Sequence, residues 1–236
     1  MSGDTDLAAV GALVGDRVRA AFLLRMLGGG PVGASDLASG AGVSASLASA
    51  HLRRLLDGGL VTVEREGRRR LYRIASVEVA EMLEAMQALA PATPVTSLRG
   101  ANGRRRLRRA RLCYDHLAGV LGVAVTEGLV DRAVLGPDRL ALGARAEPVL
   151  AEVGIEVAWL VAAPRPALRE CTDWTERRPH VSGGLGAAVA TAFLDRRWVV
   201  PRPGSRGLDV TVDGAAGLEG WLGVRLLEQP AWRDSA

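Results

Sequence analysis

Residues 35–74 predict two short helices and then a basic hairpin, and this order constrains the fold more than any other feature of the chain. Ser35 is suited to cap a helix that runs through Ala38, and Gly40–Val43 is typical of a tight turn. Ser44 is suited to cap the second helix, which carries one apolar stripe. The stripe consists of Leu47, Leu52, Leu55 and Leu56.

The hairpin follows Gly58-Gly59, a pair that stops the second helix. Residues 60–65 and 69–74 alternate in polarity as strands do, and the sequence Glu66-Gly67-Arg68 between them is typical of a turn. Two helices joined by a glycine-containing turn and followed by a basic hairpin predict a winged helix-turn-helix. In that motif the second helix enters the major groove of duplex DNA.

The predicted contacts with double-stranded DNA lie at the start of the second helix and on the hairpin. Small hydroxyl side chains let a helix approach closely and bond to bases or phosphates, and arginines suit phosphates and the minor groove. The candidates are Ser44, Ser46, Ser49, His51, Arg53, Arg54, Arg65, Arg68, Arg69 and Arg70. A protein-interaction adaptor, with the same basic face in solvent, is the alternative that the sequence leaves open.

The distribution of charge favours a polyanion as the partner of the first half. Residues 1–111 hold 17 arginines and 10 acidic residues, a net charge of +7, whereas residues 112–236 hold 13 arginines and 16 acidic residues, a net charge of −3. The basic excess therefore coincides with the predicted winged helix-turn-helix. The chain has no lysine, and the planar fork of arginine matches phosphates and guanine edges.

Further helices are expected on both sides of this motif. Residues 7–27 predict a helix, broken near Gly15-Asp16 and ended by Gly28–Pro31. Ser76 is suited to cap another helix with one apolar face. That face consists of Val79, Met82, Leu83, Met86 and Leu89.

The stretches VSASLASAHLRRLLDGGLV (residues 43–61) and EGRRRLYRI (66–74) resemble the ArsR family of bacterial winged-helix regulators, and the likeness covers residues 5–90. The resemblance implies a homodimer formed through Leu7–Leu27 and Ser76–Leu89. It implies two recognition helices about one turn of DNA apart. It also implies repression by covering a promoter, with release when a metal ion or another effector binds.

Two departures from the family pattern set this chain apart. Metal sensors of the family carry a Cys-x-Cys pair in the first helix of the motif, but residues 34–39 hold no thiol. Others place Asp and His ligands on the last helix, but residues 77–86 hold no histidine. The region beyond residue 100 is also long for the family.

We expect three parts in the chain: a DNA-binding and dimerisation domain over 1–90, a linker over 91–103 and a sensing or structural domain over 104–236. Residues 104–134 predict helix, and the layout of residues 184–206 repeats helix, strand, basic turn and strand. The fold class expected is mainly α with small β wings, and the C-terminal domain is expected to be a degenerate winged helix.

Both cysteines and two of the three histidines lie in this second region, as Cys113, His116, Cys171 and His180. A helix would put Cys113 and His116 on one face, and the other pair is expected in a proline-bounded loop. Two thiolates and two imidazoles are ligands for a tetrahedral zinc or another thiophilic metal ion. Buried structural side chains, a redox pair, or a small organic effector bound in the region of the five tryptophans remain open alternatives.

Several classes of protein do not fit the sequence. No apolar run approaches the roughly 18 residues of a membrane span, and the N-terminus lacks a basic-then-apolar signal. Two cysteines make no disulfide framework, so a reducing cytoplasm is expected. Phosphate-cradling glycine motifs and nucleophile elbows are missing, so we expect no enzymatic activity.

Overall fold

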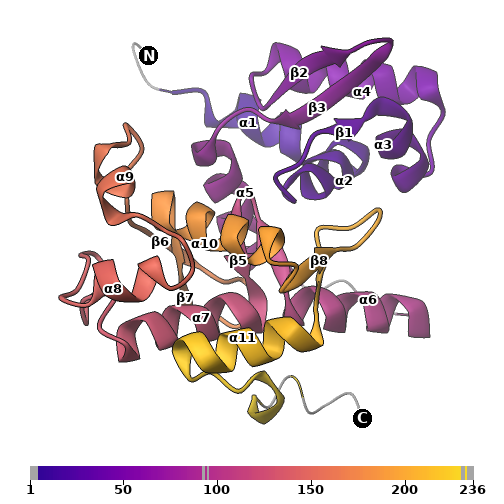
Figure 1. The fold of residues 1–236 in the computed structure, drawn as a ribbon. Helices are drawn as coiled ribbons and strands as arrows, with labels where there is room; N and C mark the ends of the chain where they lie inside the picture. Colours follow the sequence, from indigo (N-terminus) through magenta and orange to yellow (C-terminus); the bar gives the residue numbers. More distant parts are fainter. Residues whose placement is uncertain (1–4, 92–93, 95, 230–231, 233–236) are drawn as a thin grey trace. The chain divides into compact units, whose positions relative to one another are not determined.

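The computed structural model describes residues 5–91, 94, 96–229 and 232. It divides into two compact units, Met1–Leu83 and Glu84–Ala236. The division falls inside helix α5 (Val77–Leu89), before the linker expected over 91–103. Helix α6 (Leu98–Arg109) begins inside the segment that was expected to be a linker (Figure 1).

The first unit is a winged helix-turn-helix, as predicted. Its helices besides α5 are α1 (Leu7–Val14), α2 (Arg17–Met26), α3 (Ala34–Ala41) and α4 (Ala45–Asp57). Its three strands form one antiparallel sheet in the order β1-β3-β2, made of β1 (Val32–Gly33), β2 (Val61–Glu66) and β3 (Arg69–Ile74). Strands β2 and β3 are the wing, in the register Val61↔Ile74 to Glu66↔Arg69.

Local sequence explains where the helices of the first unit break. The predicted break at Gly15-Asp16 is present, because the Asp16 carboxylate accepts hydrogen bonds from the backbone N–H groups of Val18 and Arg19 and starts α2. The turn between α3 and α4 needs Gly42, whose φ of +67° is costly for residues with a Cβ. Ser44 caps α4 as expected, but Gly33 rather than Ser35 occupies the N-cap of α3.

The second unit contains helices and small two-stranded sheets. After α6 its hairpins are β4 (Arg111–Cys113) with β5 (His116–Ala118), β6 (Arg169–Thr172) with β7 (Pro179–Ser182), and β8 (Val199–Pro201) with β9 (Leu208–Val210). Its further helices are α7 (Gly119–Asp131), α8 (Ala146–Ala151), α9 (Val157–Ala162), α10 (Gly183–Asp195), α11 (Val212–Leu222) and the 3-10 turn η1 (Leu226–Glu228). The helix and hairpin predicted over 184–206 are thus α10 and β8–β9, whereas the helix predicted over 104–134 is interrupted by β4 and β5.

An internal repeat that none of the sequence patterns above predicted organises this second unit. The pattern Arg-x-Cys, a turn, and His-x-x-Gly-x-x-Gly occurs at residues 111–122 and again at 169–186. In both copies a hairpin leads directly into a helix through a glycine with positive φ, +76° at Gly119 and +77° at Gly183. The turns differ in length, two residues in the first copy and eight in the second, which hides the repeat from a fixed-period search.

The two copies pack against each other reciprocally. Helix α7 of the first copy contacts strand β7 of the second, and helix α10 of the second contacts β5 of the first. Leu121 and Leu185, at equivalent positions of the two helices, are both fully buried in one core. The repeat therefore builds a core in which each hairpin lies against its counterpart's helix.

A buried ion pair joins the copies. The Asp173 carboxylate, in the β6–β7 turn, lies 2.8 Å from a guanidinium nitrogen of Arg111 on β4, and both side chains are fully buried. The same carboxylate accepts hydrogen bonds from the backbone N–H groups of Gly119, Thr175 and Glu176. Although burial opposes it, the charge of Arg111 and these hydrogen bonds hold the pKa of Asp173 well below its usual range. This stabilisation is present above about pH 4, where an unfolded aspartate titrates, and is lost as the pH falls through the folded pKa.

Replacing Asp173 by alanine leaves the Arg111 guanidinium buried without its carboxylate. We expect Asp173→Ala to lower the free energy of unfolding of the second unit by about 3–5 kcal/mol. All five tryptophans lie between residues 159 and 232, so tryptophan fluorescence during urea unfolding follows this unit. Glu219→Ala removes an exposed partner of Arg225 and is the control, with an expected change within about 0.5 kcal/mol. An equally small change for Asp173→Ala would show that the pair does not hold the hairpins together.

Candidate DNA-binding face and Cys/His centre

The first turns of α4 present an exposed face of small side chains. Ser44, Ser46 and Ser49 are all exposed, and the Ser49 hydroxyl donates a hydrogen bond to the carbonyl oxygen of Ala45. Leu47 was expected on the buried stripe, but its side chain is 45% exposed among these serines. The core stripe of α4 is instead completed by Ala48, with Leu52 and Leu55. The exposed start of α4 therefore combines hydroxyls with one apolar side chain.

His51, which was predicted to contact DNA, is half-buried and lies apart from that exposed face. Its Nδ1 lies 3.4 Å from a guanidinium nitrogen of Arg19 and 3.5 Å from the Asp16 carboxylate, and its ring packs edge-on against Phe22. Arg19 in turn donates hydrogen bonds to the carbonyl oxygens of Ala12 and Leu13 at the end of α1. His51 thus links α4 to α1 and α2. It supports the exposed face of α4 from the side of the helix that packs against the rest of the unit.

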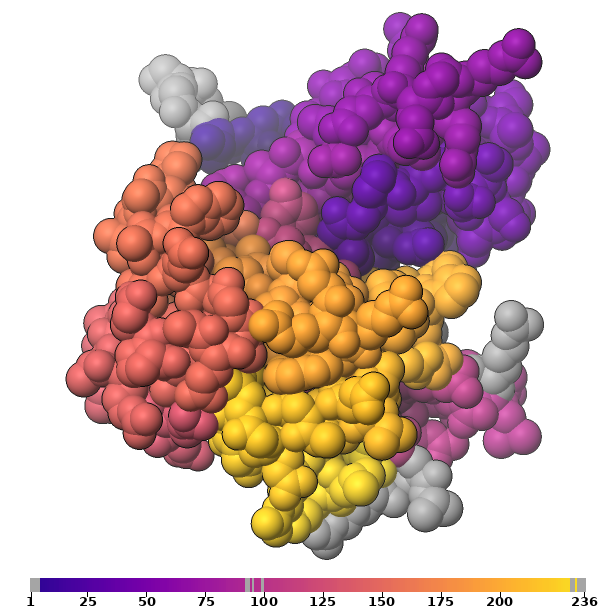
Figure 2. Space-filling model, in the orientation of Figure 1, coloured from indigo at the N-terminus to yellow at the C-terminus, as the bar shows by residue number. Residues whose placement is uncertain are grey.

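The arginines named from the sequence remain on the surface. Arg53 and Arg54 lie on the exposed side of α4, and Arg65, Arg68, Arg69 and Arg70 all lie exposed on the wing. Figure 2 shows the hairpin at the surface of the first unit, in purple. Two of these arginines have distant acidic neighbours, Arg53 at 3.8 Å from Asp57 and Arg69 at 4.0 Å from Asp36. Such exposed pairs are weak, so their guanidinium groups stay available to phosphates.

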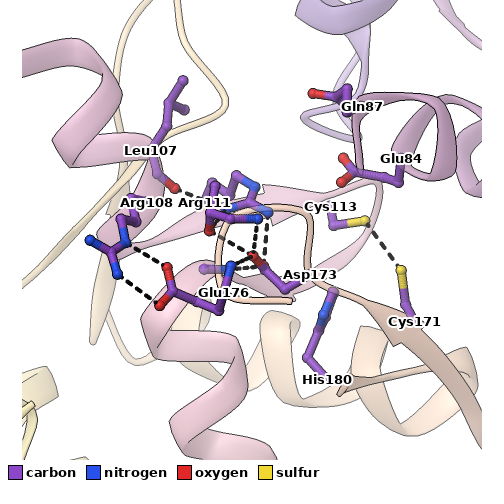
Figure 3. Close-up of polar contacts among 12 residues, drawn as sticks. Glu84, Gln87, Leu107, Arg108, Arg111, Cys113, Cys171, Asp173, Glu176 and His180 are labelled. Atoms are coloured by element: carbon purple, nitrogen blue, oxygen red, sulfur yellow. Dashed lines mark hydrogen bonds and ion pairs between the residues drawn. The ribbon is translucent and has the colours of Figure 1, made fainter. Parts of the chain in front are cut away.

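The four Cys and His side chains of the second unit come together, and we call them the Cys/His centre. Cys113 faces His116 across the β4–β5 hairpin, and Cys171 faces His180 across β6–β7. These pairings replace the expected helix face and loop. The two sulfurs lie 4.0 Å apart (Figure 3). The two histidine Nε2 atoms lie 3.1 Å apart. All four ligand atoms lie within 4.8 Å of one another, and all four residues are buried.

Two of the distances within the centre are close to those of a tetrahedral metal site. Zinc–sulfur bonds of about 2.3 Å give a tetrahedral edge of about 3.8 Å between sulfurs, and zinc–nitrogen bonds of about 2.0 Å give an edge of about 3.3 Å. The observed separations of 4.0 Å and 3.1 Å are close to both. The 3.1 Å separation is also that of a hydrogen bond between the two imidazoles, which an ion bound by both Nε2 atoms would replace.

A carboxylate outside the centre orients one of the imidazoles. Nδ1 of His116 lies 3.3 Å from the Asp115 carboxylate, which is itself held by the Arg165 guanidinium. This partner leaves Nε2 directed at the centre, as outer carboxylates do for metal-bound histidines. Burial lowers the pKa of His116, but the Asp115 hydrogen bond and the Cys171 contact outweigh it and raise the pKa.

The two thiols differ in their electrostatic surroundings. Contacts with Cys113, His116 and His180 lower the pKa of the Cys171 thiol to about 3 against the effect of burial. The contact with Cys171, burial and the charge of Glu84 raise the pKa of Cys113 well above its usual value. A lowered pKa favours the thiolate of Cys171, the form of cysteine that binds metals.

The C-terminal half of α5 lies beside this centre. Glu84 is buried and pairs with Arg206, which also donates a 2.7 Å hydrogen bond to the side-chain oxygen of Gln87. The backbone of the Arg206 segment bonds to β4, where the N–H of Leu112 donates to the carbonyl oxygen of Arg206. A continuous set of hydrogen bonds therefore runs from the strand of Cys113 to α5.

A winged helix-turn-helix with an exposed recognition helix and an arginine-rich wing defines the class of DNA-binding transcriptional regulators. Residues 14–64 match a model described as a helix-turn-helix domain. Over 223 residues, the chain is 34% identical to a protein of Bacillus subtilis (strain 168) named "Uncharacterized HTH-type transcriptional regulator YdfF". That match covers 94% of this chain and 99% of the relative.

Two solved structures each match about a third of this chain. A possible transcriptional regulatory protein from Mycobacterium bovis (fragment 1–100) is 35% identical, with 35% of this chain and 88% of that chain covered and a TM-score of 0.33. HlyU from Vibrio cholerae is 26% identical, with 36% and 88% covered and a TM-score of 0.33. On the match that covers 94% of its length, the chain belongs to the HTH-type transcriptional regulators. None of the helices that the structure describes is both long and apolar enough for a bilayer span.

The position of His51 predicts that its side chain stabilises α4. The exposed serines at the start of α4 are expected to contact DNA. We expect His51→Ala to lower the local stability of α4 by about 1–3 kcal/mol, because it leaves a nearly buried Arg19 with fewer partners. Hydrogen–deuterium exchange of the α4 amides measures this loss. Ser46→Ala is the matched control, because it should weaken DNA binding with a stability change within about 0.5 kcal/mol. If hydrogen–deuterium exchange of the α4 amides is unchanged in His51→Ala, His51 does not stabilise α4 and remains a candidate DNA contact.

The wing arginines are expected to bind phosphates rather than read bases. Arg68→Ala should weaken binding to specific and unrelated duplexes alike and reduce the slope of log affinity against log salt by about one. Fluorescence anisotropy over a salt series measures both quantities. Arg145→Ala, which removes an exposed arginine of the second unit, controls for net charge. A slope that Arg68→Ala leaves unchanged would contradict the assignment of the wing.

Proposed function

We propose that this regulator is a homodimeric repressor that leaves its DNA when the Cys/His centre captures a thiophilic metal ion, zinc in the first instance. The observation that supports the proposal is the convergence of two sulfurs and two Nε2 atoms, from two separate hairpins, within 4.8 Å of one another. Two thiolates and two imidazoles are a common ligand set of zinc. The site takes one ligand pair from each copy of the repeat.

The first helix supports the proposed dimer. Helix α1 has the sequence LAAVGALV, yet Val14 alone of its residues is buried, and Leu7 is 79% exposed. An apolar helix left largely in solvent is typical of a surface that a second protein covers. We infer a second copy of the chain as that protein, because an isologous dimer sets two copies of α4 for two half-sites of DNA.

The route from metal capture to DNA release runs through α5. An ion bound by Cys113 would fix β4, whose backbone holds the Arg206 segment, and Arg206 holds Glu84 on α5. Helix α5 continues into the DNA-binding unit, so a shift in its position changes how the recognition helices are presented. This coupling requires that the metal prefers one position of α5 over the other.

A redox pair is the second candidate, supported by the separation of 4.0 Å between the two sulfurs. A disulfide would bring the sulfurs to about 2.05 Å. The metal accounts for more of the geometry, because it uses all four of the side chains that converge, whereas a disulfide uses the two sulfurs alone. Alkylation of the thiols before and after reduction distinguishes a disulfide from a metal-bound pair.

Removing the thiols should abolish both metal binding and the response to metal. We expect elemental analysis of the purified protein to give about one zinc per protomer, and Cys113→Ser with Cys171→Ser to lose it. Once a chelator has removed that zinc, adding zinc back should release promoter DNA from the wild type in a gel-shift titration, whereas the double variant should stay bound. His51→Gln alters the one histidine outside the centre and should retain zinc.

Three outcomes would contradict parts of this proposal. Zinc retained by the double variant would exclude the Cys/His centre as the metal site. A double variant that still releases DNA on zinc addition would exclude the centre as the sensor. Failure to bind its own upstream DNA at low salt, together with capture of another polypeptide, would favour the protein-interaction adaptor.

A further inference from the structure

The second unit has an open cavity of about 700 Å³ between α9 and α10, apart from the Cys/His centre. Its volume lies within the range of roughly 300–1,000 Å³ that small-molecule sites occupy. Apolar side chains from both helices line its floor, among them Leu160 on α9 and Ala188 and Ala192 on α10. The cavity is therefore large and apolar enough for an organic molecule.

Helix α9 supplies an aromatic side chain that the fold itself does not use. Leu160 is the one buried residue of α9, whereas Trp159, which lines the cavity, is 77% exposed. A tryptophan contributes a large apolar area when it is covered, so its exposure at a cavity favours a role in binding. An indole face also attracts cations more strongly than other aromatic rings do.

The charges around the cavity favour a cation. Glu156 and Asp195 line it, and neither carboxylate forms an ion pair with another described residue. Of the two lining arginines, Arg165 is neutralised by Asp115, which leaves Arg196 as the single guanidinium outside an ion pair. Two carboxylates therefore face one arginine, and the exposed indole lies next to Glu156 in the chain.

We propose that this cavity binds an amphipathic organic cation, with its apolar body against α10 and its charge between Trp159 and the carboxylates. We further infer that its occupancy is coupled to the Cys/His centre, a step that rests on the proposed metal function. Arg165 lines the cavity and holds Asp115, and Asp115 contacts Nδ1 of His116. A ligand that shifts Arg165 changes the support of His116, and metal binding must change the affinity for the ligand equally.

Tetraphenylphosphonium and tetraphenylborate test the cavity, because the two ions have the same shape and opposite charge. In calorimetric titrations of the full chain, we expect the cation to bind at least about tenfold more tightly than the anion. Trp159→Ala should lose about tenfold in affinity for the cation, and Glu156→Gln should reduce its preference over the anion. Val161→Ala, on the same helix but outside the cavity, and Glu147→Gln, on α8, should change neither.

The outcomes test the cavity and its coupling to the Cys/His centre separately. Equal or tighter binding of the anion would overturn the proposed ligand class, and no binding of either ion, or binding that Trp159→Ala leaves intact, would overturn the site. For the coupling, the cation's affinity should differ by about fivefold between zinc-loaded and zinc-free protein, and Asp115→Asn at saturating zinc should abolish the difference. Equal affinities in the wild type would overturn the coupling alone. A wild type that takes up no zinc would overturn the proposed function, while the comparison of the two ions still decides the cavity.

Discussion

The second unit depends on the buried contact between Arg111 and Asp173. A charge without water costs several kcal/mol, so each of these side chains requires the other, and each belongs to a different hairpin. Asp173 also binds the N–H of Gly119, where the first hairpin turns into α7. One carboxylate therefore fixes the register of both hairpins, and with it the meeting point of two sulfurs and two imidazoles. The Cys/His centre is a consequence of this pairing as much as of its own four residues.

The first unit could be predicted from sequence because its signals are local. Capping serines, turn glycines and a basic hairpin lie within forty consecutive residues, and the helices and strands follow them closely. The errors there concern side-chain direction: Leu47 and His51 exchange the roles expected of them, since His51 finds a partner in Arg19, 32 positions away. No pattern within one helix contains that information.

The four residues of the Cys/His centre could be named from the sequence, but their arrangement could not. The spacing of Cys113 and His116 fits a helix as well as a hairpin, and the hairpin prevails because Gly119 starts α7 only after His116. The equivalence of residues 111–122 and 169–186 was the signal that would have shown two matching hairpins. Unequal turns concealed it, and the contact between Arg111 and Asp173 spans 62 positions.

The burial of the Cys/His centre affects how fast a bound ion could exchange with solvent. His180 and His116 have almost no exposed surface, and the two cysteines have little more. An ion held at so buried a position would exchange more slowly the more the surrounding hairpins have to open, as groups protected by local unfolding do. Under the proposed metal response, such a regulator would follow the history of metal supply more than its momentary level, and its signal would persist after the supply has fallen.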